Sequence, residues 1–297
     1  MSAASGLPAP VAEPSAPASP GRPPKAGTPA PVGPNHGRAR RGSLARILAP
    51  VVVFALVLGL WTYASDHLID PTSRFLLPPP LSVLKVGLLD WQNLSEILSA
   101  LWTTTSVALT GLAISMVIGV ALGILMSQAR WVEYSVYPYA VALQTIPILA
   151  VVPLFGFWFG FDFKSRVIVC VLIPLFPIIT NTLFGMKSVE AGLHDLFSLY
   201  AANRFKRLLF LQLPAALPAI LTGFRISAGL AVIGAIIADF FFRQGNPGIG
   251  RLIDVYRQNL QTEQLLTSLL LSSLVGLVLF WGLDLLENRI VRRRNPR

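Results

Sequence analysis

The chain has 297 residues, of which 54% are hydrophobic and only 13% are charged, and its formal net charge is +10. Because an average soluble domain has about 25% charged residues, this composition excludes an ordinary soluble protein and favours an integral membrane protein. The basic residues lie at the two ends and between apolar runs, a distribution typical of membrane topology and not of a nucleic-acid-binding patch.

Residues 1–45 are rich in Pro, Ala, Gly and Ser and end in a basic cluster. This composition predicts a disordered cytoplasmic arm. A cleaved signal peptide would place its apolar stretch near the start, whereas here more than forty polar or Pro-rich residues precede it. We therefore expect the first apolar run to be a retained helix, with a transmembrane domain over residues 46–290 and a basic cytoplasmic tail over residues 291–297.

Six apolar runs follow, each long enough to cross a hydrocarbon layer of ~30 Å, which needs about 20 helical residues. They cover residues 47–65, 98–127, 135–159, 166–186, 216–242 and 264–286. A membrane barrel would require ten-residue strands of alternating polarity, and these runs do not alternate. The sequence therefore predicts an all-α polytopic membrane protein with about six transmembrane helices.

The orientation follows from Lys and Arg in the connections. With the amino end inside, sixteen of these residues lie in inner segments and seven in outer ones, and Arg225 lies within the fifth run. Positive residues concentrate on the cytoplasmic side. We expect both termini to be cytoplasmic in a bacterial plasma membrane.

The second run carries a stripe of small residues at helical i to i+4 spacing, formed by Gly111, Ser115, Gly119 and Gly123. Such a stripe lets two helix backbones approach closely in a membrane. We expect this small-residue stripe to pack within the bundle or at a subunit interface.

The third and fourth runs are rich in proline, which removes a backbone donor and clashes with the preceding turn. We expect these helices to be kinked or interrupted at Pro138, Pro147, Pro153, Pro174 or Pro177. Polar residues lie beside the prolines and are candidates to line a solute pathway: Gln144, Thr145, Thr180 and Asn181. The alternative is that these side chains hydrogen-bond neighbouring helices.

The connection between the fourth and fifth runs, Ser188 to Arg207, is polar and long for a loop between spans. Within it, apolar residues recur at helical spacing and a basic group follows. The apolar residues are Leu193, Leu196, Leu199 and Tyr200. Their face requires a cover, which is either the chain's own helix ends or a soluble partner.

This connection resembles the EAA loop of ABC importer permeases, usually written EAA, three residues, Gly, nine residues, then Ile-x-Leu-Pro. Counting back from Leu211 places the Gly position at Ala201 and the EAA positions at residues 195–197. The Leu-Pro half matches, whereas the EAA half departs from the pattern. The resemblance implies a cytoplasmic helix that couples to an ATPase subunit through Asp195, Leu196, Leu199, Ala201, Arg204, Leu213 and Pro214.

Residues 45–290 are similar to the nitrate, sulfonate, taurine and pyrimidine-precursor branch of these permeases. The stretches that carry the resemblance begin at Leu77, Gln144, Phe157, Phe176 and Gly234. The last stretch, Gly234-Ala-Ile-Ile-Ala-Asp239-Phe-Phe, has Asp239 where the family usually has Glu. The branch implies a permease homodimer, two ATPase subunits on its cytoplasmic face, an external substrate-binding protein, and a small anion or a small heterocycle as substrate.

Asp239 is a further candidate for the pathway, because a carboxylate near a helix end in low dielectric must be paired or hydrated. The alternative is a role in interfacial solvation.

The chain carries no pattern for catalysis. It has no Gly-x-x-x-x-Gly-Lys-Ser/Thr loop, so we expect ATP and Mg²⁺ to be used by a partner ATPase and this chain to bind no cofactor. The glycine cluster from Gly245 to Gly250 lacks the lysine and is expected to form a turn. The lone Cys170 and three scattered histidines give no disulfide and no metal site.

Two rival classes are less favoured. An ion-coupled secondary transporter normally has ionisable residues near the bilayer midplane, whereas Asp239 and Asp284 lie near the ends of their runs. A membrane enzyme or scaffold would show a metal pattern or a nucleophile with its base, and neither occurs here.

Overall fold

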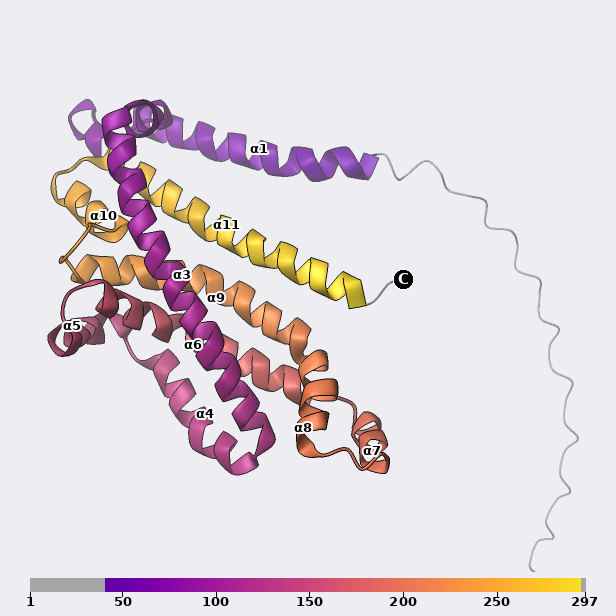
Figure 1. The fold of residues 1–297 in the computed structure, drawn as a ribbon. Helices are drawn as coiled ribbons and strands as arrows, with labels where there is room; N and C mark the ends of the chain where they lie inside the picture. The colour runs from indigo at the N-terminus through magenta and orange to yellow at the C-terminus, as the bar shows by residue number, and fades with distance from the viewer. Residues whose placement is uncertain (1–40, 295–297) are drawn as a thin grey trace, which may run out of the picture. The chain divides into compact units, whose positions relative to one another are not determined.

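The computed structural model describes residues 41–294, and within that range all regular secondary structure is helical. The chain divides into two units, residues 1–53 and 54–297, and helix α1 begins in the first and ends in the second. The longer helices are α1 (Arg41–Tyr63), α3 (Trp91–Gln128), α4 (Arg130–Thr145), α5 (Ile148–Phe159), α6 (Phe163–Lys187), α9 (Leu213–Phe241), α10 (Ile249–Gln258) and α11 (Thr262–Arg294) (Figure 1). The shorter ones are η1 (Ala64–Leu68), η2 (Pro71–Leu76), α2 (Pro80–Val83), η3 (Leu84–Leu89), α7 (Ala191–Leu199), α8 (Arg204–Arg207) and η4 (Leu208–Gln212).

Five helical segments are long and apolar enough to cross a bilayer, and a bent pair of shorter helices makes a sixth. The five are Leu48–Leu68, Trp91–Gln128, Phe163–Lys187, Arg204–Phe241 and Thr262–Ile290. This confirms the prediction of an all-α polytopic chain with about six spans. The predicted arm lies outside the described residues except for 41–45, which belong to α1, and the predicted tail is helical up to Arg294.

The third predicted run is broken, as its prolines indicated. Helices α4 and α5 meet at an angle of 103° across Ile146 and Pro147. Ile146 has an extended backbone (ψ 128°), the conformation that a following proline favours. In contrast, α6 continues through Pro174 and Pro177 without a break, so the predicted prolines interrupt only one of the two runs.

The core of residues 54–294 forms where α6 packs against both α3 and α9. Its buried members include several alanines on α9, which allow close contact: Val107, Ala108, Leu112, Val167, Cys170, Ala228, Ala231, Val232 and Ala235. Lipid tails are as apolar as these side chains, so tight packing, more than exclusion of water, holds such helices together.

The small-residue stripe of α3 packs against α6, within the chain. A Cβ atom added at Gly119 would lie 2.6 Å from Ile178 Cγ2, and one added at Gly123 would lie 2.6 Å from Thr182 Cβ. Ser115 also donates a hydrogen bond of 3.0 Å to a backbone carbonyl of α6. Of the two sites expected for the stripe, the structure therefore shows the intramolecular one.

Helix α11 and the apolar part of α1 are little covered by the rest of the described chain. In each, only 6% of the most apolar 18-residue window is buried. Leu56, Leu60 and Leu285 are all more than 60% exposed. Surfaces this apolar are unfavourable in water, so their contact is with lipid or with another subunit.

Replacing Gly119 by Ala should destabilise the fold, because the added methyl group overlaps Ile178. Overpacking of this kind costs about 1–3 kcal/mol. The matched control is Gly276→Ala on α11, where nothing lies within 4 Å of the new Cβ and the higher helix propensity of Ala favours folding. Thermal unfolding in detergent should show a lower midpoint for Gly119→Ala only. Equal midpoints for the two variants would contradict the close packing of the small-residue stripe against α6.

Candidate functional site

A cavity of about 590 Å³ opens between the bent α4–α5 pair, α6 and α9. Its lining comes from four helices and the break between α4 and α5: Leu143, Gln144, Ile146, Ile148, Leu172, Ile173, Phe176, Pro177, Thr180, Asn181, Ile226, Leu230, Ile233 and Ile237. Three of the predicted pathway residues, Gln144, Thr180 and Asn181, lie in this lining, whereas Thr145 and Asp239 do not. The structure thus brings the polar positions of the third and fourth runs together around one cavity.

The polar side chains of the cavity are partly used by their own helix. Thr180 Oγ1 donates to Phe176 O at 3.0 Å, and Asn181 Nδ2 donates to Pro177 O at 2.8 Å. Thr145, outside the cavity, donates to Ala142 O. Each of these three side chains is therefore bonded to its own helix. In the cavity lining, Thr180 keeps its hydroxyl oxygen as an acceptor, and Asn181 keeps Oδ1 and one amide N–H.

Asp239 is fully buried near the end of α9 and pairs with Arg166 near the start of α6. Arg166 Nη1 lies 3.3 Å from Asp239 Oδ1, and the two side chains are 2% and 0% exposed. The guanidinium also donates to the carbonyls of Phe242 (2.8 Å), Gln244 (2.8 Å) and Asn246 (3.0 Å). One cation thus neutralises the carboxylate and satisfies carbonyls beyond the end of α9, which otherwise have no helical partner.

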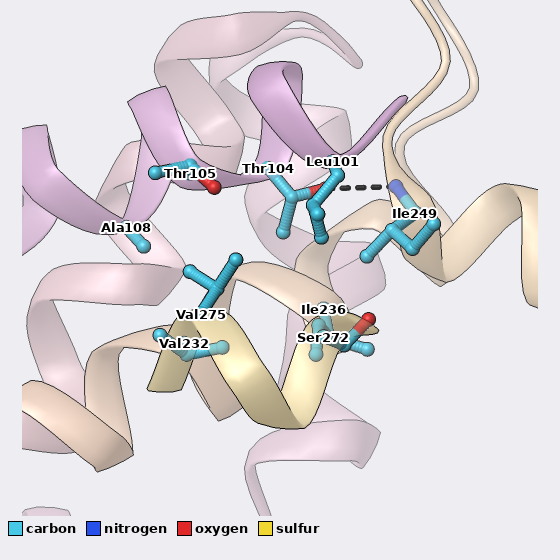
Figure 2. A pocket seen from close by; sticks show the side chains of 9 residues that line it. All are labelled: Leu101, Thr104, Thr105, Ala108, Val232, Ile236, Ile249, Ser272 and Val275. Carbon is cyan, nitrogen blue, oxygen red and sulfur yellow. Dashed lines mark hydrogen bonds between the residues drawn. The ribbon is translucent and has the colours of Figure 1, made fainter. Parts of the chain in front are cut away.

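The glycine-rich segment between α9 and α10 encloses the same carboxylate. A Cβ at Gly248 would lie 2.0 Å from Asp239 Oδ2, so only glycine permits this approach. Thr104 on α3 donates its hydroxyl to Asp239. The same oxygen accepts the N–H of Ile249 at 2.7 Å, beside a small apolar pocket (Figure 2). The segment forms the expected turn, and it also joins α3, α6, α9 and α10 in one buried polar latch around Asp239.

Arg225, the basic residue within the fifth run, is compensated by α11. Its guanidinium lies 2.7 Å from Asp284 and 3.5 Å from Glu287. It also lies over the ring of Phe280, 5.5 Å from the centroid. This network fixes α9 to α11, and it leaves no unpaired charge at Arg225.

A second polar cluster surrounds Asp254 on α10, outside the candidate spans. Arg257 binds its carboxylate at 2.8 Å and Arg243 at 3.2 Å. The hydrogen bond from Arg257 holds the pKa of Asp254 below its ordinary value. Both arginines keep about two thirds of their side chains exposed, so this end of the molecule presents a basic surface.

The predicted coupling segment projects from the bundle as α7, followed by α8 and η4. No residue of α7 is buried. Leu199 and Tyr200 are 85% and 80% exposed, and Leu193 and Leu196 are exposed as well. Within residues 41–294, no helix end covers this face.

Ala201 ends this helix in the left-handed backbone region, with φ of +48°. Its N–H bonds Ser198 O and the next N–H bonds Phe197 O, both at 3.0 Å. Glycine is the residue that takes this conformation at lowest cost, and Ala201 occupies the glycine position of the loop it resembles. Arg207 then donates to Ser198 Oγ at 3.0 Å and holds α8 against α7.

The remaining residues predicted for coupling lie on either side of this turn. Asp195 and Arg204 are exposed. Leu213 and Pro214 form the first positions of α9 and are partly buried. The predicted set therefore spans one exposed helix and the entrance to the next transmembrane helix.

Sequence reasoning missed Arg166 and Thr104 as partners of Asp239. They precede it by 73 and 135 residues, and neither belongs to a local motif. The only available signal was a lone arginine close to the start of an apolar run.

Comparison with known proteins identifies similar chains. Residues 115–293 match the family described as "Binding-protein-dependent transport system inner membrane component". A formylaminopyrimidine transport permease of Halalkalibacterium halodurans is 35% identical over 81% of this chain and 94% of its own length. A riboflavin transport system permease of Chloroflexus aurantiacus is 35% identical over 73% of this chain and 80% of its own length. A taurine transport system permease of Escherichia coli is 28% identical over 77% of this chain and 83% of its own length.

Replacing Asp239 by Asn should strongly destabilise the chain, because the Arg166 charge would remain buried without its partner. Breaking one side of a buried pair costs about 3–5 kcal/mol. Asp66→Asn is the matched control: its pair with Arg74 lies 3.6 Å apart with side chains 39% and 46% exposed, and exposed pairs contribute less than about 1 kcal/mol. Thermal unfolding in detergent compares them, and a midpoint for Asp239→Asn as high as the control's would argue against a structural latch.

Proposed function

Because the chain belongs to the family of binding-protein-dependent transport system inner membrane components, we propose that it is the permease subunit of an ATP-driven importer. In this assignment it forms the solute pathway along the α4–α6 and α9 cavity, and a separate subunit binds ATP and Mg²⁺ and hydrolyses the nucleotide. The observation that carries the proposal is the exposed apolar face of α7, at the position that resembles the coupling loop of such permeases.

Coupling to the ATPase rests on the apolar side chains at the end of α7. Burying a leucine in a partner groove contributes about 1.5–3 kcal/mol, whereas an exposed charge such as Arg204 contributes less than about 1 kcal/mol. Leu199, Leu196 and Ala201 therefore form the core of the docking surface, with Asp195 and Arg204 at its rim.

Transmission to the pathway uses the helix that follows. α8, η4 and α9 form one apolar helical segment, Arg204–Phe241, which begins at the docking surface, supplies four cavity residues and ends at the latch. ATP binding closes two ATPase subunits and moves α7, so the cavity alternates between inward and outward openings. The ligand changes this equilibrium only through different interaction energies with the two states.

The assembly contains two copies of this permease, two ATPases and an external substrate-binding protein. The apolar faces of α1 and α11 provide surface for lipid or a second copy. The basic surface of Arg243 and Arg257 around Asp254 provides an outer contact for the binding protein. The charge distribution supports cytoplasmic termini in a bacterial plasma membrane.

An ion-coupled secondary transporter is the alternative, and the packing disfavours it. The cavity lining includes no ionisable side chain. Asp239 is enclosed by Arg166 and Thr104, and Asp284 pairs with Arg225. A carboxylate that binds protons or sodium in turn must face the pathway, which neither does. Relatives are named for taurine and for heterocycles, so the substrate is a small anion or a small heterocycle.

The docking assignment predicts that Leu199→Ala weakens binding of the ATPase. Loss of about 1.5–3 kcal/mol corresponds to roughly 10- to 100-fold in affinity. Ala201→Glu should release the ATPase altogether, since it adds a charge at a left-handed turn. Co-purification of the ATPase and substrate uptake should both fall while the permease still inserts in the membrane.

Leu89→Ala is the matched control, because Leu89 is also a highly exposed leucine (77%) at a helix end, on the opposite side in the proposed topology. It should keep normal ATPase binding. If Leu199→Ala and Ala201→Glu behave like this control, the partner docks elsewhere.

The topology is tested by cysteine labelling from outside the cell in a Cys170→Ala background. A cysteine at Asn246, in the connection before α10, should react with an impermeant maleimide, and one at Glu190, just before α7, should not. Both positions are exposed, so burial does not limit either reaction. Reversed labelling would overturn the orientation.

A further inference from the structure

We propose that a polar pocket at the amino end of α4 binds the phosphate of an anionic phospholipid headgroup. The pocket lies where α3 ends, α4 begins and α6 ends, and its volume is about 610 Å³. The proposed topology places this end of the bundle at the cytoplasmic face. Its lining residues are Met126, Ser127, Arg130, Glu133, Tyr134 and Lys187. This Arg130 pocket shares no lining residue with the cavity described above, so the inference goes beyond the proposed function.

The charge of the Arg130 pocket favours an anion. Its lining has two cations, Arg130 and Lys187, and one anion, Glu133, which leaves a formal charge of +1. Lys187 Nζ lies 2.6 Å from both carboxylate oxygens of Glu133, so that carboxylate is compensated within the pocket. The guanidinium of Arg130 forms no ion pair and no side-chain hydrogen bond within residues 41–294. The uncompensated charge of the pocket is therefore the positive charge of Arg130.

The hydrogen-bonding groups that remain free in the pocket are mainly donors. Arg130 has the N–H groups of its guanidinium, and Lys187 has one ammonium N–H left after its two bonds to Glu133. The hydroxyl of Tyr134 forms no hydrogen bond within residues 41–294. The hydroxyl of Ser127 already donates to its own helix. Phosphate oxygens accept hydrogen bonds, and arginine binds them through paired, charge-assisted bonds. The pocket therefore matches a phosphate group.

The surface beside the pocket favours a phospholipid over free phosphate as the source of this group. Tyr134, Tyr137 and Val141 follow Arg130 at intervals of four, three and four residues, so they share one face of α4, and all are exposed. On α6, the exposed Phe184 precedes the pocket's lysine by one turn. Along α4 the order is basic, then aromatic, then aliphatic, which is the order of headgroup, interface and acyl chain in a membrane. A free phosphate would contact only the first of these.

Position within the bilayer agrees with this choice. Basic pockets between transmembrane helices on the cytoplasmic side are typical sites for anionic lipid headgroups. The α4–α5 pair is a candidate span, so α4 enters the membrane from the Arg130 pocket. A headgroup at Arg130 thus leaves its acyl chains beside the exposed apolar side chains of α4 and α6.

Lipid binding to the full chain in detergent micelles tests the inference. The probe is phosphatidylglycerol with a fluorescent label on its acyl chain, and fluorescence anisotropy measures its displacement by unlabelled lipids. Unlabelled phosphatidylglycerol should compete about fivefold or more better than phosphatidylcholine, whose phosphate carries a compensating cation. Equal competition by the two lipids overturns the inference. Neither ATPase nor solute is present, so this result does not depend on the proposed function.

A matched pair of arginine variants separates the pocket from a general attraction to anionic lipid. Arg130→Gln should weaken binding of labelled phosphatidylglycerol about fivefold, the usual contribution of one basic residue beside an anionic lipid. Arg289→Gln removes another exposed arginine, outside the pocket and also unpaired within residues 41–294, and should leave binding nearly unchanged. Equal losses in the two variants would show that the pocket has no special role.

Glu133→Gln gives a test in the opposite direction. It removes the only carboxylate of the lining and frees Lys187, so the formal charge of the pocket rises from +1 to +2. Because the pair is partly exposed, its loss costs little stability. Binding of labelled phosphatidylglycerol should become about fivefold tighter. Unchanged or weaker binding contradicts recognition of the headgroup by charge.

Two controls distinguish other occupants of the pocket. An excess of inorganic phosphate should displace the labelled lipid no better than sodium chloride of the same ionic strength, which controls for screening. Stronger displacement by phosphate shows that the site takes the free ion, and the assignment to lipid fails. If Arg130→Gln lowers co-purification of the ATPase and leaves lipid binding unchanged, the pocket belongs to the ATPase interface and the inference is wrong.

Discussion

Close approach of helix backbones is the constraint on which the rest of this structure depends. In a bilayer, burial against another helix gains little over contact with lipid, so packing must be tight to hold a bundle together. Helix α6 achieves this on two sides, against the small-residue stripe of α3 and against the alanines of α9. Because α6 is fixed in this way, Thr180 and Asn181 are held at the wall of the cavity, and Arg166 is held opposite Asp239.

Ion pairs add a second set of contacts between the helices. Two ion-pair networks join helices of the bundle: Arg166 pairs with Asp239, and Arg225 pairs with Asp284 and Glu287. In the buried pair, Arg166 also donates to a backbone carbonyl at the end of α9, and glycines of the following segment lie against the Asp239 side chain. Burial of charges contributes little net stability when compared with an apolar core. Its effect is to favour one arrangement of α3, α6, α9 and α10 around Asp239 over alternative packings.

The sequence predicts the features that depend on local pattern. The spans follow from apolar length, the break of the third run from Pro147, and the stripe from i to i+4 spacing. The loop resemblance places a glycine position at Ala201, and the structure has a left-handed backbone there. Features that depend on tertiary contacts could not be predicted from the local sequence pattern. The partner of Asp239 is 73 residues away, and α6 continues through its prolines because packing on both sides supports it. Likewise Asp239, a candidate for the pathway by sequence, lies in the latch and not in the cavity lining.

The position of α9 explains how one chain can connect three sites. Its amino end follows the left-handed turn at Ala201, its middle supplies Ile226, Leu230 and Ile233 to the cavity, and its carboxyl end is held by Arg166. Under the proposed function, a movement of the predicted coupling segment reaches the cavity through this helix, which Arg225 ties to α11 and the latch ties to α6. The cavity wall contributed by α9 is apolar, so no ion pair within this wall has to break when the opening changes. A ligand shifts the two states through the difference between its binding energies to them.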